Sequence, residues 1–228
     1  MPLSSPRRAP LAGQVIDQLR NQITSGEWPV GSRIPTEPEL VEQLGVARNT
    51  VREAVRALAH NGLLDIRQGA GTFVVATSEL AGVMNRRFAQ ADPQEVAELR
   101  SALETKAAAL AAHRRTEADL DRLETLLERR ERAWRSGEAD RFIDADAAFH
   151  AAVVTAAHNE VLAAVYADLG TVVRGFLREG IGTELRPEGL TDHARLVAAI
   201  RAGDAGAAGL EAASHPFVCH PAAGGADA

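Results

Sequence analysis

One aspartate and three histidines in the second half of the chain have the residue types of a metal site. Asp146 and His150 lie four residues apart in DADAAFH, so a helix there would project both from one face. His193 begins a segment with aliphatic residues at helical spacing, which indicates that its side chain points inward, and His215 closes the last such segment. Imidazole and carboxylate ligands together suit zinc, nickel, manganese or iron. Spacing alone favours an ordinary Asp–His ion pair and a buried core histidine over a metal site.

A second set of polar residues, near the start of the chain, could contact nucleic acid. Arg48 and Arg52 share one face of a predicted helix, and Asn49 lies beside them near its start. Arginine can donate two hydrogen bonds to guanine and asparagine can pair with adenine, and either can hold a phosphate instead. Isolated arginines more often line a solvated helix face, so the interpretation depends on the elements around them.

Those elements form a helix, a turn, a second helix and a hairpin. Apolar residues recur at helical spacing before and after Gly45, and a glycine permits the tight turn that such a helix pair needs. Strands are predicted over 64–67 and 72–75, with Gly69 and Gly71 at the tip between them. This order predicts a winged helix-turn-helix, in which the second helix enters the major groove of DNA.

The rest of the chain is rich in alanine and patterned for helices. Helices are predicted near 79–91, 93–112, 116–136, 138–157, 159–179, 189–202 and 204–215, with glycine and proline at the breaks. The fold class is therefore mostly α: a winged helix-turn-helix followed by an antiparallel all-α helical bundle. The expected domains are a flexible basic arm (1–10), the DNA-binding domain (11–77), an effector-binding and dimerisation domain (78–215) and a flexible tail (216–228).

Charge and cysteine content narrow the class of partner. The net charge is −6, but residues 1–78 hold 8 arginines and 7 acidic residues, a net of +1, so the remainder carries −7. A local basic patch on the first domain is therefore compatible with DNA binding. Cys219 is the only cysteine, which excludes an internal disulfide and fits a reducing cytoplasm. No stretch is apolar for long enough to span a bilayer, so no membrane association is expected.

The first domain resembles a known family of regulators. The segments RIPTEPEL, GVARNTVREAVRAL and NGLLDIRQGAGTFV are similar to the N-terminal domain of the GntR family of bacterial transcription regulators, over about residues 14–75. The resemblance implies a recognition helix and a wing tip that contact DNA. Its DNA-contact positions match Arg48, Asn49, Thr50, Arg52, Gln68 and Gly69.

Two residues depart from the pattern of that family. Ala47 stands where the family usually has Ser or Thr, so it can neither cap the recognition helix nor offer a hydroxyl to phosphate. Pro38 stands where some members place an arginine that contacts DNA. Both departures leave more of the binding to the remaining recognition-helix residues and the wing.

The second domain resembles the FCD domain of the FadR-type branch of the same family. The match covers roughly residues 79–215 and includes DADAAFHAAVVTAAHNEVL and DHARLVAAIRAGDAGAAGLEAASH. Many members hold a metal in the centre of the bundle with one Asp and three His. The resemblance therefore implies a divalent transition metal, with zinc expected ahead of nickel, manganese or iron, at Asp146, His150, His193 and His215. Pro216, directly after His215, departs from the pattern of a continuing helix.

The resemblance also implies an effector pocket beside the metal. Arg100 matches a pocket-facing arginine suited to the carboxylate of an effector, and an intrahelical pair with Glu104 is a compatible alternative. Asn159 matches a polar position that lines the pocket, and a helix N-cap is its alternative role.

These features predict a ligand-responsive transcription regulator rather than an enzyme. By resemblance it is expected to be a homodimeric repressor that binds a pseudo-palindromic DNA operator and responds to a small organic acid. A metal-dependent hydrolase fused to a DNA-binding domain is one alternative, although the chain contains no HExxH motif. A regulator with a purely structural metal is the other.

Overall fold

The computed structural model describes residues 11–181, 185 and 192–214. Helices account for most of this part of the chain, which confirms the predicted mostly α class. The chain divides into two compact units between Arg86 and Arg87. No helix among the described residues is long and apolar enough to cross a membrane. The predicted arm (1–10) and tail (216–228) lie outside the described residues.

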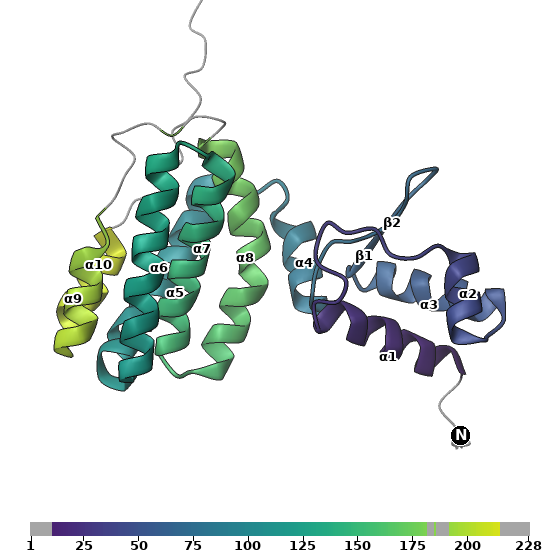
Figure 1. Cartoon of the computed structure of the whole chain (residues 1–228), viewed down its shortest axis with the longest axis horizontal. Helices are drawn as coiled ribbons and strands as arrows, with labels where there is room; N and C mark the ends of the chain where they lie inside the picture. The colour runs from purple at the N-terminus through teal and green to yellow at the C-terminus, as the bar shows by residue number, and fades with distance from the viewer. Residues whose placement is uncertain (1–10, 182–184, 186–191, 215–228) are drawn as a thin grey trace, which may run out of the picture. The chain divides into compact units, whose positions relative to one another are not determined.

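The first unit contains the predicted helix-turn-helix (Figure 1). Gly45 ends the first helix of the motif in the left-handed conformation, with φ of 64°, and its N–H bonds back to the carbonyl of Val41. A side chain at this position would be strained, which explains the glycine. The elements are α1 (Leu11–Thr24), α2 (Glu37–Leu44), α3 (Arg48–His60), β1 (Leu64–Arg67) and β2 (Gly71–Val74).

The two strands pair as an antiparallel hairpin. The register runs from Leu64 opposite Val74 to Arg67 opposite Gly71, so the second strand begins one residue earlier than predicted. Gly69 lies in the connecting turn with φ of +76°. The predicted wing is therefore present, and its tip is formed by exposed residues.

An apolar core joins the helices of this unit. Leu19 and Ile23 of α1 pack in one cluster with Val51 and Leu58 of α3, at the spacing of an amphipathic helix. In α2 only Leu40 is fully buried, while the other apolar residues of that helix are partly covered. The core thereby fixes α3 with its arginine-bearing face away from the interior.

A further helix, α4 (Glu79–Phe88), packs against the winged helix rather than standing apart as a linker. A Cβ atom added to Gly82 would lie 2.5 Å from the backbone oxygen of Gly62, so the two backbones touch. Glu79 accepts a 2.9 Å hydrogen bond from Asn61, and Asn85 donates to the carbonyl of Val75. These contacts explain why the units divide after Arg86, later than the boundary near residue 77 that composition favours.

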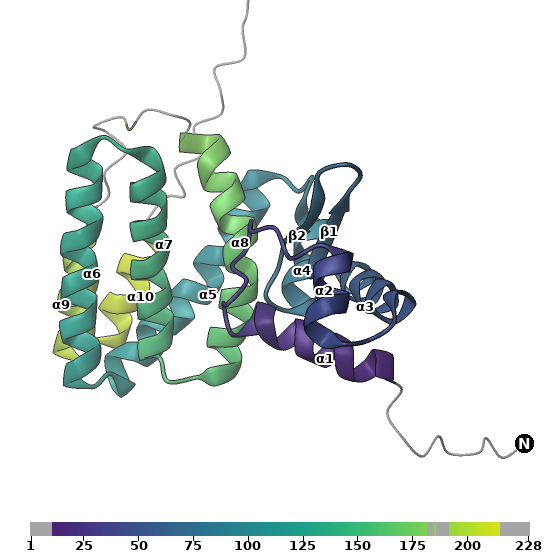
Figure 2. The ribbon, with the colours of Figure 1, turned by 45° about the vertical axis from the view of Figure 1, so that its right-hand side comes forward.

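The second unit is a helical bundle. Figures 1 and 2 show α6, α7 and α8 side by side, and α9 and α10 pack on α5. Short connections turn α7 and α8 back on the helix before them and α10 back on α9, as in an antiparallel bundle. Its helices are α5 (Pro93–Arg114), α6 (Glu117–Ser136), α7 (Ala139–Ala156), α8 (Glu160–Ile181), α9 (Ala194–Ala202) and α10 (Ala205–Ser214).

The core of the bundle combines small and large side chains. Ala108, Ala112 and Ala208 are fully buried between helices, and their size lets α5 and α10 approach closely. Phe149 and Leu196 fill the space next to them. This packing holds α7 and the start of α9 in fixed positions, which matters because both carry predicted site residues.

The helix predicted over 189–202 begins later than expected. Its first helical residue is Ala194, because Asp192 accepts a 2.8 Å hydrogen bond from the Ala194 N–H and His193 takes the N-cap position. Residues 186–191 lie outside the described part of the chain.

Candidate metal centre and nucleic-acid interface

The N-terminal turn of α3 presents the predicted DNA-contact residues. The Arg48 side chain is 65% exposed, Asn49 is exposed and Thr50 is half-buried. Ala47 is the N-cap and makes no side-chain cap bond, as its lack of a hydroxyl requires. No side chain at this position covers the N–H groups of the first turn of α3. These groups point out of the N-terminal end of the helix, where anions are favoured.

Glu37, which the sequence did not single out, pairs with both recognition-helix arginines. Its carboxylate lies 3.4 Å from Arg48 Nε and 3.3 Å from Arg52 Nη2. Burial opposes the charged form of Glu37, but the bonds to Arg52 and Arg48 outweigh it and lower its pKa. The two guanidinium groups are thereby gathered at one place beside the start of α2, where Pro38 occupies the first turn.

The predicted wing residues lie at the tip of the hairpin. Gln68 and Gly69 are exposed in the turn that follows β1. Arg67 lies with its guanidinium carbon 4.6 Å from the centre of the Phe73 ring, an arrangement that holds a cation over an aromatic face. The wing and the start of α3 thus both expose polar residues.

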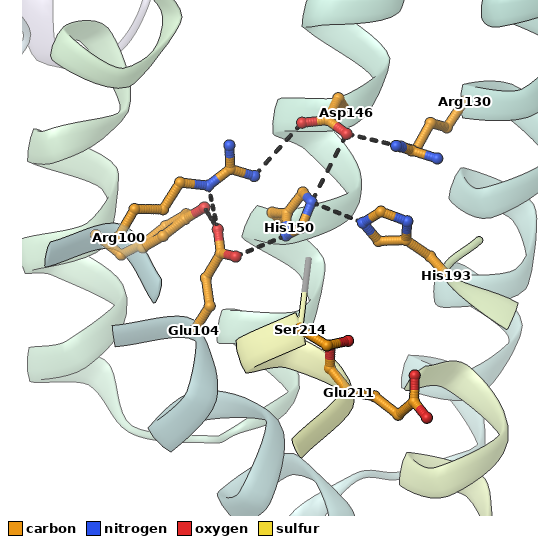
Figure 3. Close-up of polar contacts among 9 residues, drawn as sticks. Arg100, Glu104, Arg130, Asp146, His150, His193, Glu211 and Ser214 are labelled. Atoms are coloured by element: carbon orange, nitrogen blue, oxygen red, sulfur yellow. Dashed lines mark hydrogen bonds and ion pairs between the residues drawn. The ribbon is translucent and has the colours of Figure 1, made fainter. Parts of the chain in front are cut away.

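In the second unit the structure brings three of the predicted metal ligands together (Figure 3). Asp146 and His150 project from α7 and His193 from the start of α9, and their ligand atoms lie within 4.8 Å of one another. The three residues are 6%, 4% and 2% exposed. His215, the fourth predicted ligand, lies outside the described residues.

The geometry of this cluster fits a transition metal. The Nε2 atoms of His150 and His193 face each other at 3.1 Å, and Asp146 Oδ1 lies 3.7 Å from His150 Nε2. Two imidazole nitrogens that share one tetrahedral zinc ion at its usual bond length are separated by about 3.3 Å, close to the observed distance. Two imidazoles and a carboxylate are also the donor types that such ions prefer.

Glu104 of α5 fixes the orientation of the His150 ring. Its Oε2 lies 3.0 Å from His150 Nδ1, which directs Nε2 towards His193 and Asp146. Its Oε1 accepts 2.5 Å hydrogen bonds from Arg100 Nε and from the hydroxyl of Tyr166. A carboxylate behind a ligating histidine is the usual support of a metal site, because it sets the tautomer of the ring.

The electrostatics of the cluster favour ionised carboxylates. Burial opposes the charge on Glu104, but His150 and Arg100 overcome it and hold its pKa well below the usual range. Burial likewise opposes ionisation of Asp146, and His150, Arg100 and Arg130 together lower its pKa. Burial raises the pKa of Tyr166, so this hydroxyl stays protonated and donates to Glu104.

Two buried arginines flank Asp146 (Figure 3). Arg100 Nη2 lies 3.4 Å from Asp146 Oδ2, and Arg130 Nε lies 2.7 Å from Asp146 Oδ1. Arg100 thus makes the pairing with Glu104 that the sequence left open as an alternative, and its role towards an effector remains a prediction. Arg130 was missed in the sequence because it stands in an arginine-rich run of α6. It does continue the buried stripe of Leu120 and Leu123, which is the signal that could have revealed it.

Asn159 takes the role of a helix cap. Its Oδ1 accepts a 3.1 Å hydrogen bond from the Leu162 N–H in the first turn of α8. This is the alternative that the sequence left open for Asn159. A place for Asn159 in an effector pocket remains a prediction.

Two family models match the chain. Residues 11–74 match the model described as bacterial regulatory proteins, gntR family, and residues 95–215 match the FCD domain. The first covers the winged helix and the second covers the bundle, so the two matches account for both compact units.

Individual relatives agree with these matches. The chain is 30% identical to the galactonate operon transcriptional repressor of Escherichia coli, over 86% of this chain and 89% of the relative. It is also 30% identical to the Uxu operon transcriptional regulator of Escherichia coli, over 86% and 80%. Among solved structures, a Streptococcus agalactiae GntR protein is 29% identical over 90% and 96% of the two chains, with a TM-score of 0.50. These relatives are regulators and not enzymes, and the chain belongs to the GntR family of DNA-binding transcription regulators, with an FCD domain as its second unit.

Proposed function

We propose that the bundle of this regulator binds a divalent transition metal and a small organic acid, and that the acid changes the affinity for an operator. Zinc is the preferred metal, and Asp146, His150 and His193 are its ligands, with His215 as the fourth. The buried cluster with ring nitrogens 3.1 Å apart is the observation that carries the proposal.

The surrounding residues support a site for an anion beside the metal. A divalent ion held there would supply a Lewis-acidic position for the oxygens of a carboxylate. Arg100 adds a guanidinium that is 6% exposed and already contacts Asp146, so a carboxylate next to the metal would lie within reach of a charge-assisted hydrogen bond. The named link of one relative to a galactonate operon supports a carboxylate effector and a repressor role.

The operator is read by the first unit. We infer a homodimer that places two copies of α3 in successive major grooves of a pseudo-palindromic site, as other helix-turn-helix dimers do. The acid acts only if it binds the DNA-competent and DNA-incompetent states with different affinities. In a repressor of this kind, the bound acid favours the incompetent state.

The test uses an operator selected from random DNA with the metal-loaded protein. We expect organic acids that bind the bundle to weaken operator binding in an anisotropy titration. Asp146→Ala combined with His150→Ala should lose stoichiometric metal by elemental analysis and lose the response to the acid, while its operator binding persists. Asp144→Ala is the matched control, since its exposed carboxylate lies on the same helix and faces Arg178.

Each outcome separates the proposal from its alternatives. Retention of stoichiometric metal by the double variant would refute the ligand assignment. An acid that raises the melting temperature but leaves operator affinity unchanged would refute the regulatory link. Stabilisation by metal with no effect of any acid would show a purely structural metal.

A further inference from the structure

A surface cleft between α6 and α7 is formed by residues that belong neither to the metal cluster nor to the predicted DNA contacts. Its volume is about 290 Å³, close to the smallest pockets that hold small molecules. Figures 1 and 2 show the two helices side by side, and the rings of Trp134 and Phe142 pack edge to face with centres 4.8 Å apart. The cleft is lined by Arg129, Arg132, Ala133 and Ser136 of α6 and by Arg141 and Asp144 of α7. The proposed function gives this cleft no role.

The lining of the cleft is positively charged. It contains three guanidinium groups and one carboxylate, a net of +2, whereas residues 79–228 as a whole carry −7. The arginines come from both helices, so each wall of the cleft contributes cations. The cleft therefore favours an anion locally, although the domain that contains it is acidic.

The ion pairs of these arginines leave donors available. Arg132 Nη1 lies 3.3 Å from Glu128, and Arg141 Nη1 lies 2.6 Å from Glu138. Each pair uses one nitrogen of a group with five N–H donors, and exposed pairs of this kind stabilise a protein little, so a bound anion can compete with them. Among the residues that the structure describes, no acid forms an ion pair with Arg129.

Asp144 adds a hydrogen-bond acceptor to the cleft. Its carboxylate is 58% exposed, and its ion pair with Arg178 is long, at 3.9 Å. An ionised carboxylate repels an anion but accepts hydrogen bonds from hydroxyl groups. A ligand that combines an anionic group with hydroxyl groups can therefore use all the charged residues of the lining.

We propose that the cleft binds a phosphorylated polyol or sugar. Arg129, Arg132 and Arg141 hold the phosphate, and Asp144 accepts a hydrogen bond from a hydroxyl group. A phosphomonoester carries close to two negative charges at neutral pH and has three terminal oxygens, one for each guanidinium group. A DNA phosphate has only one charge and two such oxygens, and a duplex is too wide to enter a cleft of this volume.

Calorimetry on the full chain tests this site with glycerol 3-phosphate, glucose 6-phosphate and inorganic phosphate. We expect one equivalent of at least one of the two organic phosphates to bind, and to bind more tightly than inorganic phosphate. Arg129→Met combined with Arg141→Met removes two of the three guanidinium groups. Loss of their charge-assisted hydrogen bonds should weaken binding by about tenfold or more.

Two further variants separate the cleft from general electrostatic attraction. Arg122→Met combined with Arg135→Met makes the same change of charge at exposed arginines of α6 that do not line the cleft, and should bind as the wild type does. Asp144→Asn removes the repulsion and the charged acceptor together. It should bind inorganic phosphate more tightly and lose the preference for the organic phosphate, a pair of opposite changes that partial unfolding cannot produce. Melting temperatures establish that each variant is folded.

The outcomes decide the inference independently of the metal site. Absence of saturable binding of both organic phosphates overturns it, and so does an equal loss in the two double-arginine variants. Equal affinity for organic and inorganic phosphate overturns the contact of a hydroxyl group with Asp144. Weaker operator binding by the cleft variant, without any loss of phosphate binding, would assign these arginines to DNA instead. Asp146→Ala combined with His150→Ala should bind the organic phosphate unchanged, so failure of the metal-dependent site leaves this one standing. If the cleft variant does not fold, the wild type and Asp144→Asn decide the question.

Discussion

At the scale of single residues, Arg52 lies on the predicted recognition helix, and an ion pair with Glu37 holds its side chain in place. Its guanidinium is joined to Glu37 together with that of Arg48, so the ion pairs hold both groups beside the start of α2. An arginine contacts either a base edge or a phosphate of DNA. Loss of a base contact changes sequence specificity, whereas loss of a phosphate contact changes the salt dependence of binding.

Replacement of this arginine provides a direct measurement. Arg52→Ala should weaken operator binding by about 1–3 kcal/mol if the side chain reads a base. If it holds a phosphate, the slope of log affinity against log salt concentration should become smaller by about 1. Arg132→Ala, an exposed arginine paired with Glu128 in the bundle, is the charge-matched control. Unchanged affinity in a gel shift would show that α3 is not the recognition helix.

The pH dependence of metal binding follows from His150. Burial disfavours its charged form, but Glu104 and Asp146 raise its pKa above the usual value. In the metal-free protein, protonated His150 stabilises the fold below the unfolded pKa of about 6.5, and this contribution is lost as the pH rises through the folded pKa. Metal binding has the opposite slope, because a ligating histidine must lose its proton.

Zinc should therefore raise the melting temperature little at pH 6 and increasingly towards pH 8.5. Each pH unit below the folded pKa should cost about tenfold in metal affinity, or about 1.4 kcal/mol. Glu104→Gln removes the carboxylate that contributes most to raising the pKa, so the onset of stabilisation should move to lower pH. An equal shift at pH 6 and pH 8.5 would contradict the assignment of His150 as a ligand.

Residue types and spacing predicted only part of this site. The separation of Asp146 and His150 predicted that both project from one face of a helix. The aliphatic neighbours of His193 predicted that its side chain points inward, and the structure brings the three residues together. The contacts of Glu104 with His150 and with Tyr166 could not be predicted, because they join α5, α7 and α8 across the bundle. Sequence spacing describes one helix at a time, and these contacts depend on how the helices pack.

At the scale of elements, the close approach of α4 to the winged helix depends on two glycines. Gly82 and Gly62 leave no room for a Cβ atom between the two backbones. Composition could not reveal this contact, because α4 has the same alanine- and glycine-containing pattern as the bundle that follows. The lengths of α5 to α8 were predictable to within about two residues, because proline, threonine and glycine stand at their ends.

Gly82→Ala should consequently destabilise the first unit. Its new methyl group would meet the Gly62 carbonyl at 2.5 Å, and overpacking of this kind costs about 1–3 kcal/mol. We expect a lower melting temperature and faster hydrogen exchange along α4. Gly175→Ala is the control, since no atom lies within 4 Å of the added carbon and alanine favours helix. Equal stability of the two variants would exclude a tight α4 contact.

At the scale of the whole molecule, the DNA-binding part of the chain and the rest of the chain differ in net charge. The first 78 residues carry +1 and the remaining residues −7. An acidic bundle disfavours non-specific contacts with DNA, so we expect the electrostatic attraction to come from the basic residues of the first 78 residues.

The packing of α4 also bears on how such proteins can be recombined. A hybrid joined near residue 77 would take α4 from a different parent and leave the surface around Gly62 without its partner. A hybrid joined between Phe88 and Pro93 keeps that surface covered by its own helix. Residues 11–88 are therefore the segment that should be transferred as one piece with the DNA-binding domain. We expect exchange of the second domain, by engineering or by evolution, to succeed at a junction after residue 88.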